Sequence, residues 1–280
     1  MEPVPTRIDV APPYKLVHSR YGWMLVNPND AYLGQAIVQY GECCEIEVAF
    51  LLQLVSLRPG IVMEVGTNIG THTVPIAQAL ARQNRRLYAF EPQPVIFQNM
   101  CANVALNGLG NVMAWPSACG DRAGTLFFSP PDYFVGGNFG GVSMSTEPIP
   151  NGMAIPCIEL DEVFGRETVS LMKVDVEGFE LLVLQGAEVI IDNCRPVLYV
   201  ENDRPEKSRE LIDWLWSKEY RLWWHTPPLF NPANFFANPN DIYPRVVSIN
   251  MLCLPREAEV PVNGLKEIVV NGHPLEGAPA

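Results

Sequence analysis

The chain has 280 residues, of which 48% are hydrophobic, enough for one large domain or two small ones. Its 31 acidic residues outnumber the 19 lysines and arginines and give a net charge of −12. Such a charge repels a phosphate backbone, so we expect no nucleic-acid partner.

Short β-branched runs alternate with longer helical patterns between Ile61 and Leu254. Helices are predicted at residues 44–57, 71–82, 94–107, 179–191 and 205–218. Strands are predicted at residues 61–65, 86–90, 112–115, 170–174, 196–200, 220–224 and 246–254. This alternation predicts an α/β fold, a doubly wound and mostly parallel sheet with helices on both faces.

Three segments follow from this pattern. Residues 1–58 are predicted to form an N-terminal extension with a helix that covers the active site, residues 59–255 the core, and residues 256–280 a C-terminal tail. Two irregular stretches, 129–153 and 225–244, follow strands, on the edge where open α/β sheets bind ligands. The first is about 25 residues long, a length typical of a functional loop.

The seven cysteines show no CxxC spacing, and Cys43 and Cys44 are adjacent, which rarely permits a disulfide. A reducing compartment fits this pattern. The N-terminus lacks the apolar stretch of a signal peptide, and no apolar run approaches the ~18 residues of a membrane helix. We therefore predict a cytoplasmic protein without a membrane span, and an oligomer is compatible with the sequence.

The segment VMEVGTNIGTHT, residues 62–73, has the pattern of a strand, a tight turn and a helix. Gly66 and Gly70 let the backbone turn and approach a ligand, and the N–H groups of the next helix favour an anionic group. The G-x-G-x-x-G spacing of dinucleotide enzymes is absent. Glu64 indicates a cationic ligand instead, and S-adenosyl-L-methionine carries a sulfonium and an ammonium.

Glu91 ends the second predicted strand, 25 residues after Gly66 (91 − 66 = 25). A carboxylate at this place can accept hydrogen bonds from both ribose hydroxyls of a nucleoside. Both NAD and S-adenosyl-L-methionine contain this ribose. Glu91 therefore supports a nucleoside ligand without choosing between them.

Four stretches together resemble the FkbM-type family of S-adenosylmethionine-dependent methyltransferases. They read EVGTNIGTHT, AFEPQPVIFQNMCANVALNG, LMKVDVEGFELLVLQGA and VLYVENDRPEKS, and the similarity extends from about Tyr21 to Leu254. The resemblance implies the class I methyltransferase (Rossmann-like) fold, in which the last of seven strands is antiparallel. It also implies methyl transfer to a hydroxyl oxygen of a sugar, glycan or related natural-product acceptor.

The resemblance also assigns residues. It implies that the methionine end of the cofactor lies along the glycine turn, the ribose at Glu91, and the adenine edge at residues 117–119. The implied cofactor-binding residues are Glu64, Gly66, Asn68, Gly70, Glu91, Ser117, Ala118 and Asp175. Where family members often carry tryptophan and serine, this chain has Cys43 and Cys44, which puts an acceptor contact there in doubt.

Methyl transfer to an alcohol requires a group that activates the hydroxyl. Asp175 follows one predicted strand, and Glu201 and Asn202 follow the next. On neighbouring parallel strands these side chains would form an oxygen-only site for Mg²⁺ or Ca²⁺, similar to the metal site of catechol O-methyltransferase. The alternative is that the two acids only end strands and accept hydrogen bonds. His225, after the strand YRLWW, is a candidate general base or a structural loop histidine.

Three functions remain open at this point. An O-methyltransferase is the first, a nicotinamide-dependent oxidoreductase of Rossmann type the second, and a nucleoside-binding protein without catalysis the third. The missing glycine disfavours the second, and the presence of Asp175, Glu201 and His225 argues against the third.

Overall fold

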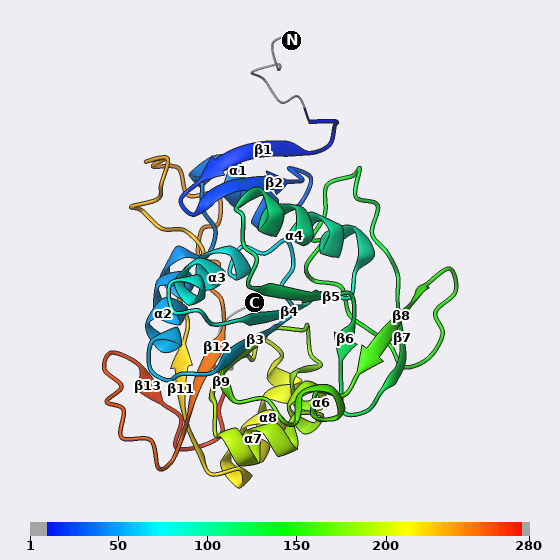
Figure 1. The fold of residues 1–280 in the computed structure, drawn as a ribbon. Coiled ribbons are helices and arrows are strands. Elements are labelled where there is room, and N and C mark those ends of the chain that lie inside the picture. The colour runs from blue at the N-terminus through cyan, green and yellow to red at the C-terminus, as the bar shows by residue number, and fades with distance from the viewer. Residues whose placement is uncertain (1–9, 276–280) are drawn as a thin grey trace.

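The computed structural model describes residues 10–275, and its centre is an eight-stranded sheet (Figure 1). The strand order is β13-β11-β12-β10-β9-β3-β4-β5. The strands are β3 (Ile61–Val65), β4 (Leu87–Phe90), β5 (Val112–Trp115), β9 (Val169–Val174), β10 (Val197–Glu201), β11 (Tyr220–His225), β12 (Asn250–Pro255) and β13 (Lys266–Glu267). Strands β5, β4, β3, β9 and β10 pair in parallel, whereas β12 is antiparallel to both β10 and β11. The predicted doubly wound, mostly parallel sheet with an antiparallel last strand is confirmed.

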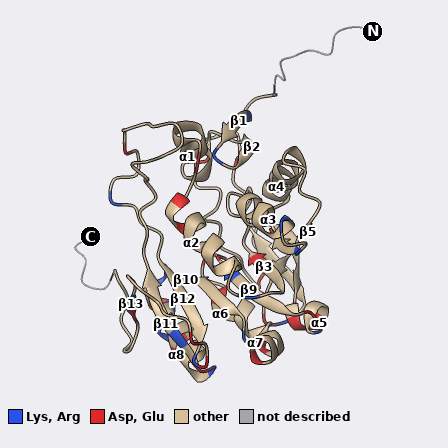
Figure 2. Cartoon of the chain, turned by 60° about the vertical axis from the view of Figure 1, so that its left-hand side comes forward, with Lys and Arg blue, Asp and Glu red and all other residues tan. Residues whose placement is uncertain are grey.

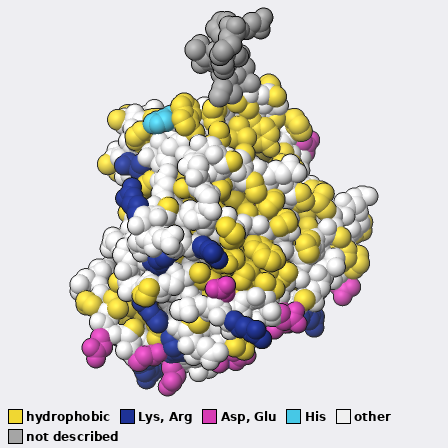
Figure 3. Space-filling model, in the orientation of Figure 1, with side chains coloured by type: hydrophobic (Ala, Val, Ile, Leu, Met, Phe, Trp, Pro, Cys, Tyr) yellow, Lys and Arg dark blue, Asp and Glu magenta, His cyan; other side chains and the backbone are white. Residues whose placement is uncertain are grey.

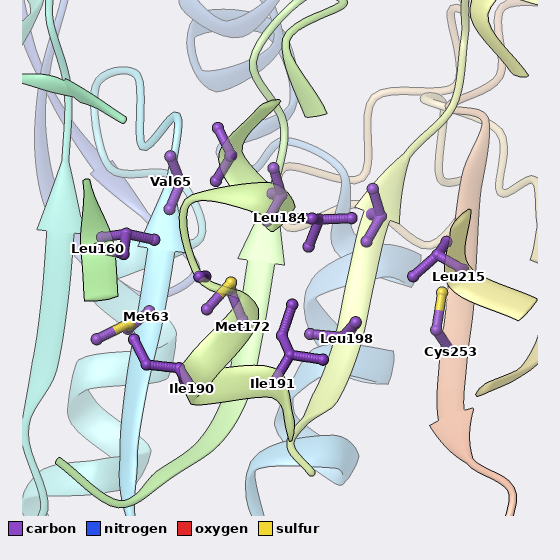
Figure 4. Packing of buried hydrophobic residues seen from close by; sticks show 14 of the residues in the cluster. Met63, Val65, Leu160, Met172, Leu184, Ile190, Ile191, Leu198, Leu215 and Cys253 are labelled. Carbon is purple, nitrogen blue, oxygen red and sulfur yellow. The ribbon is translucent and has the colours of Figure 1, made fainter. Parts of the chain in front are cut away.

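Helices cover both faces of this sheet, because alternate residues of each strand point to opposite sides. On one face, Met63, Met172 and Leu198 pack against the helices α5 (Leu160–Phe164), α6 (Glu180–Gln185), α7 (Glu188–Cys194) and α8 (Pro205–Ser217) (Figure 4). On the other face, Val62 and Leu171 pack against α2 (Glu45–Val55) and α3 (Thr73–Ala81). The two apolar layers hold the strands in register and fix the edge at which they end.

The N-terminal segment packs beside the sheet. Strands β1 (Lys15–Ser19) and β2 (Gly22–Val26) form a hairpin, followed by α1 (Leu33–Tyr40). Helix α4 (Pro94–Leu106) lies along β2. Asn103 Oδ1 accepts a hydrogen bond from Leu25 N at 2.6 Å, and Asn99 Nδ2 donates to Leu25 O at 2.7 Å. These amides satisfy the open edge of β2, which attaches the hairpin to the core.

A small second sheet lies beyond β5 (Figure 1). It contains β6 (Ala118–Cys119), β8 (Met153–Ile158) and β7 (Gly124–Phe128) in that order. Residues 129–152 connect β7 to β8, and Phe139 from this connection is buried. The face drawn in Figure 3 shows hydrophobic side chains gathered over the middle of the molecule, where β4 and β5 lie, and charged side chains mainly below them.

All seven predicted strands are present, whereas one predicted helix and several short elements differ from expectation. The helix predicted at 179–191 is divided into α6 and α7 at Gly186. A Cβ at Gly186 would lie 1.9 Å from Gly120 O, so the backbone of the small sheet passes directly against this break. The hairpin, α1, α5, the small sheet and β13 had not been predicted. Among the described helices, none combines the length and the apolar character needed to cross a membrane.

Candidate functional site

A cavity of about 500 Å³ lies at the carboxyl ends of β3, β4, β9 and β10. The loops after these strands supply Gly66, Glu91, Asp175 and Glu201 to its wall. The segments 138–141 and 245–250, from the irregular stretches noted above or directly after them, complete the wall. In Figure 2 the ribbon is red, the colour of Asp and Glu, at the start of α2 and beside β3, near this edge of the sheet. The site is therefore where an open α/β sheet is expected to bind its ligand.

The turn after β3 forms the floor of the cavity. Gly66 and Gly70 have φ of 85° and 87°, and Asn68 has φ of 48°. A Cβ at Gly66 would lie 1.7 Å from Asp175 O, so only glycine allows this contact between the two loops. Gly66 and Asn68 line the cavity, whereas Gly70 and Glu64 are not among its lining residues. The turn thus brings backbone, rather than bulky side chains, to the ligand.

Glu64 lies beneath the turn and is fully buried. Its Oε2 accepts a hydrogen bond from Thr73 Oγ1 at 2.8 Å, and its Oε1 has no hydrogen-bond partner among the described residues. Burial raises the pKa of Glu64, and the charge of Lys173 on the adjacent strand opposes this effect. Glu64 therefore stabilises the turn from its buried side, through the hydrogen bond with Thr73, and contributes to the electrostatic potential there.

Glu91 connects the turn to the end of β4. Its Oε2 accepts a hydrogen bond from Asn68 N at 3.0 Å, and its Oε1 accepts one from Gln93 N at 2.9 Å. Burial raises the pKa of Glu91 to about 7, although these two hydrogen bonds act in the opposite direction. Each carboxylate oxygen keeps a further lone pair, so the group can also accept two hydrogen bonds from a diol.

A narrow apolar slot adjoins the cavity at Glu91. Its wall includes Glu91, Ser117, Ala118 and the apolar side chains of Leu126, Val142, Met144 and Phe179. Ser117 Oγ is buried and has no hydrogen-bond partner among residues 10–275. A flat heteroaromatic ring with polar edge atoms would fill the slot and satisfy this hydroxyl. The slot, the carboxylate of Glu91 and the glycine turn thus offer the three kinds of surface that the parts of S-adenosyl-L-methionine would need.

Asp175 and Glu201 face the cavity next to a buried lysine. Lys173 Nζ lies 2.8 Å from Asp175 Oδ2. Burial acts to raise the pKa of Asp175, but Lys173 holds it below its usual range. Burial and the charge of Asp175 raise the pKa of Glu201 well above its usual range. The site therefore contains one carboxylate whose pKa is lowered beside one whose pKa is raised.

Asn202 does not join these two acids. Its side-chain nitrogen donates to Ser208 Oγ at 2.9 Å and contacts Met251 Sδ at 3.3 Å. It is also not among the residues that line the cavity. The structure therefore does not bring Asn202 together with Asp175 and Glu201 at the cavity, as the predicted Mg²⁺ or Ca²⁺ site requires.

His225 lies on a different cavity, of about 610 Å³, which is bordered by β11 and the segment 264–274. Its Nδ1 lies 2.7 Å from Tyr199 Oη, and its ring centroid lies 4.4 Å from that of Phe50. Burial lowers its pKa. The structure therefore does not bring His225, the predicted general base, to Asp175 and Glu201. Its contacts are those of a structural histidine, the alternative given in the sequence analysis.

The cavity of about 500 Å³, called the main cavity from here on, is also lined by Cys44, Glu47 and His72. The sequence had not indicated these three residues as a group. The Nε2 of His72 lies 3.3 Å from Oε1 of Glu47. Cys44 and Glu47 are three residues apart at the start of α2, a spacing that places side chains on one helix face. That spacing was the available signal, but the contact with His72 depends on the packing of α2 against α3.

Glu42 joins three segments of the chain through its side-chain hydrogen bonds. Its Oε2 accepts hydrogen bonds from Arg20 Nε at 2.6 Å and Phe235 N at 2.8 Å. Its Oε1 accepts one from Asn231 Nδ2 at 2.8 Å. One buried carboxylate therefore ties the hairpin, the segment before α2 and the 226–249 segment together.

Comparison with known proteins gives a family and several similar proteins. Residues 64–222, more than half of the chain, match the model of the methyltransferase FkbM domain. The hexuronic acid methyltransferase AglP of Haloferax volcanii is 30% identical over 145 residues, which cover 51% of this chain and 56% of that protein. The chain thus aligns with about half the length of this curated relative.

Solved structures are similar at lower identity. A methyltransferase FkbM from Methylobacillus flagellatus KT has 16% identity and a TM-score of 0.47, with 70% of this chain and 45% of that chain covered. Cofactor-bound Rv0187 from MTB has 14% identity and a TM-score of 0.47, with 76% and 81% covered. The domain match over more than half of the chain decides the assignment: the protein belongs to the FkbM family of S-adenosylmethionine-dependent methyltransferases.

Proposed function

We propose that the protein transfers a methyl group from S-adenosyl-L-methionine to a hydroxyl oxygen of a neutral sugar, glycan or related natural-product acceptor. The observation that carries this proposal is the junction at Glu91, where an apolar slot opens into a large acidic cavity. The slot would take the nucleoside, and the cavity beyond it would leave room for a second molecule. Family membership supports the methyl-transfer chemistry.

The chain's own residues would bind and orient the donor. The sulfonium supplies an electrophilic methyl group when the cofactor is bound. Glu91 would accept hydrogen bonds from both ribose hydroxyls, and Ser117 would bond to the adenine edge. Gly66 and Asn68 would present backbone to the methionine end, which would then lie near the N-terminal end of α3.

Asp175 and Glu201 are the proposed residues for the acceptor. A general base works best when its pKa lies near the operating pH. The neighbouring charge of Asp175 and burial move the pKa of Glu201 in that direction. Asp175, held ionised by Lys173, would accept a hydrogen bond from the acceptor and orient it. Glu201 would take up the hydroxyl proton as the methyl group is transferred.

The charge of the cavity favours a neutral acceptor over an acidic one. The acidic side chains in its lining are Glu47, Glu91, Asp175, Glu177, Glu201 and Asp203, whereas Arg245 is the only lysine or arginine among its described lining residues. Carboxylate excess attracts the cationic donor and repels an anion such as a sugar acid. We therefore propose a different acceptor class from the hexuronic acid in the name of the Haloferax relative.

Binding and turnover test the proposal separately. Adenosylhomocysteine should raise the melting temperature of the purified protein, whereas NAD should not. S-Adenosyl-L-methionine is then offered with a panel of neutral glycosides and matched uronic acids, and products are identified by mass spectrometry. Methyl ethers of the neutral sugars are expected. Methyl esters of the uronic acids would contradict the acceptor class, and binding without product across both sets would favour a non-catalytic nucleoside-binding protein.

Variants assign the roles. Asp175→Asn and Glu201→Gln should each lower kcat by roughly 100-fold or more, in the range typical of general acid–base groups. His225→Phe is the control, since His225 lies on the other cavity, and its kcat should stay within about threefold of the parent. A large loss of kcat in the His225 variant, with the fold intact by circular dichroism, would restore that residue as a catalytic candidate.

A further inference from the structure

Three side chains with different donor atoms meet on one wall of the main cavity. Cys44, Glu47 and His72 each offer one ligand atom, a sulfur, a carboxylate oxygen and an imidazole nitrogen. These atoms all lie within 4.8 Å of one another. Glu47 and His72 are buried, Cys44 is half-buried, and all three line the cavity. The group therefore combines mutual proximity with access to the site.

The fold builds this group from the starts of two neighbouring helices. Cys44 precedes α2 with φ of 52°, Glu47 lies in the first turn of α2, and His72 precedes α3. Helices α2 and α3 lie side by side (Figure 1). A left-handed φ is unfavourable for cysteine and persists only where surrounding contacts enforce it. This conformation starts the helix while the thiol remains at the cavity wall.

The contact between His72 and Glu47 has the separation of two ligands on one metal ion. His72 Nε2 lies 3.3 Å from Glu47 Oε1, yet no described residue forms a hydrogen bond with this buried nitrogen. Zinc bonds of about 2.0–2.2 Å to nitrogen and oxygen, at tetrahedral angles, separate the two ligand atoms by roughly 3.4 Å. The observed distance between His72 Nε2 and Glu47 Oε1 is close to this ligand-to-ligand distance. The two groups are not oriented to form a hydrogen bond with each other.

The surrounding contacts also suit a cation. Asn250 Nδ2 lies 3.3 Å from Glu47 Oε2, which orients the carboxylate from behind. Lys173 is the nearby positive charge, and its Nζ is engaged by Asp175 at 2.8 Å. Two anionic ligands, a thiolate and a carboxylate, would neutralise a divalent ion. Sulfur and nitrogen ligands select zinc over Mg²⁺ or Ca²⁺, which prefer oxygen.

We propose that Cys44, Glu47 and His72 form a zinc site with three protein ligands and a fourth position open to the cavity. This composition is typical of catalytic rather than structural zinc, which usually has four protein ligands. Zinc binding itself is independent of the proposed methyl transfer. A role for the open position in holding the acceptor hydroxyl rests on that function, and it would place the hydroxyl in the cavity that Asp175 also lines.

The metal is tested first on the parent protein. The protein is stripped with a chelator under reducing conditions and titrated with Zn²⁺ in competition with a chromophoric indicator. One equivalent is expected to bind. Co²⁺ should then give a sulfur-to-cobalt charge-transfer band and the intense visible bands of four-coordinate cobalt. Absence of stoichiometric zinc, or a weak octahedral cobalt spectrum without the sulfur band, would overturn the site.

Variants then test the assignment of the ligands. Cys44→Ser should abolish the charge-transfer band, and His72→Ala should weaken zinc binding by more than about 100-fold. Cys101→Ser and His18→Ala are matched controls outside the cluster and should bind zinc like the parent. Retained zinc affinity in both cluster variants, or loss of the band in Cys43→Ser but not in Cys44→Ser, would overturn the assignment.

Adenosylhomocysteine affinity is measured on every variant, because it reports the fold and the cofactor site independently of the metal. Intact cofactor binding with lost zinc binding supports the site. Normal zinc binding in a protein that methylates none of the offered acceptors would leave the site standing and count only against the proposed function.

Discussion

Affinity for adenosylhomocysteine is expected to depend on pH through Glu91. The carboxylate is buried, and its pKa is raised to about 7, so the group changes charge near neutral pH. Only the ionised form has lone pairs for both ribose hydroxyls while it also accepts bonds from Asn68 N and Gln93 N. Protonation should therefore weaken cofactor binding.

The size of the effect follows from that pKa. The ionised fraction of Glu91 is about 0.09 at pH 6 and about 0.91 at pH 8, so affinity should rise about tenfold, or ~1.4 kcal/mol, between them. In the ligand-free protein, the pH dependence of the free energy of unfolding has the opposite sign. The folded pKa lies above the unfolded value, so the stability contributed by Glu91 is fully present below pH 4.5 and is lost as the pH rises through 7.

Isothermal titration calorimetry with adenosylhomocysteine at pH 6, 7 and 8 measures the effect. Glu91→Gln should bind at least about 100-fold more weakly at pH 8, since charge-assisted hydrogen bonds contribute about 1.5–3 kcal/mol each. Its affinity should also vary little with pH. The control is Glu177→Gln, because Glu177 lines the same cavity with a pKa of about 7 and should leave the profile unchanged. A flat profile in the parent protein, or one abolished by Glu177→Gln alone, would refute the role of Glu91.

Two stability predictions follow from the same site, both measured by urea unfolding. Gly66→Ala should cost about 3 kcal/mol or more, since its φ of 85° is unfavourable for alanine and the new Cβ would lie 1.7 Å from Asp175 O. Gly108→Ala has a similar φ with open space around it and should cost only about 1–2 kcal/mol; equal losses would show that the contact is unimportant. Lys173→Met should lower the free energy of unfolding by about 3–5 kcal/mol, because it leaves buried carboxylates unpaired. Its control is Lys15→Met, at an exposed position, which should lower it by about 0.5 kcal/mol or less. A Lys173 variant as stable as its control would mean that this lysine does not compensate those charges.

The sheet could be predicted from the sequence because its information is local. Each strand is a short apolar run with a breaker near it, such as Pro59 and Gly60 before β3, and seven such runs alternate with helical patterns. The elements that were missed depend on partners distant in the chain. Strand β2, for example, is completed by amides on α4, and β13 is a two-residue strand that forms only against β11.

The candidate site divides in the same way. Glu91 and Gly66 were identified because each follows a strand at a spacing that the chemistry requires, and both line the cavity. Asn202 and His225 also follow or end strands, yet their side chains point to other partners. Strand position predicts the edge of the sheet, whereas the direction of a side chain depends on the packing around it. For the same reason His72 could not be paired with Glu47 before the helices were placed.

The three hydrogen bonds of Glu42 make the placement of the 226–249 segment depend on one buried carboxylate. An exchanged 226–249 segment should keep this attachment if it offers donors equivalent to Asn231 Nδ2 and Phe235 N. A segment that lacks them would leave a buried anion with Arg20 as its remaining donor, and the protein should then be less stable. Donors at these two positions, more than the length of the segment, should therefore decide which chimeras fold.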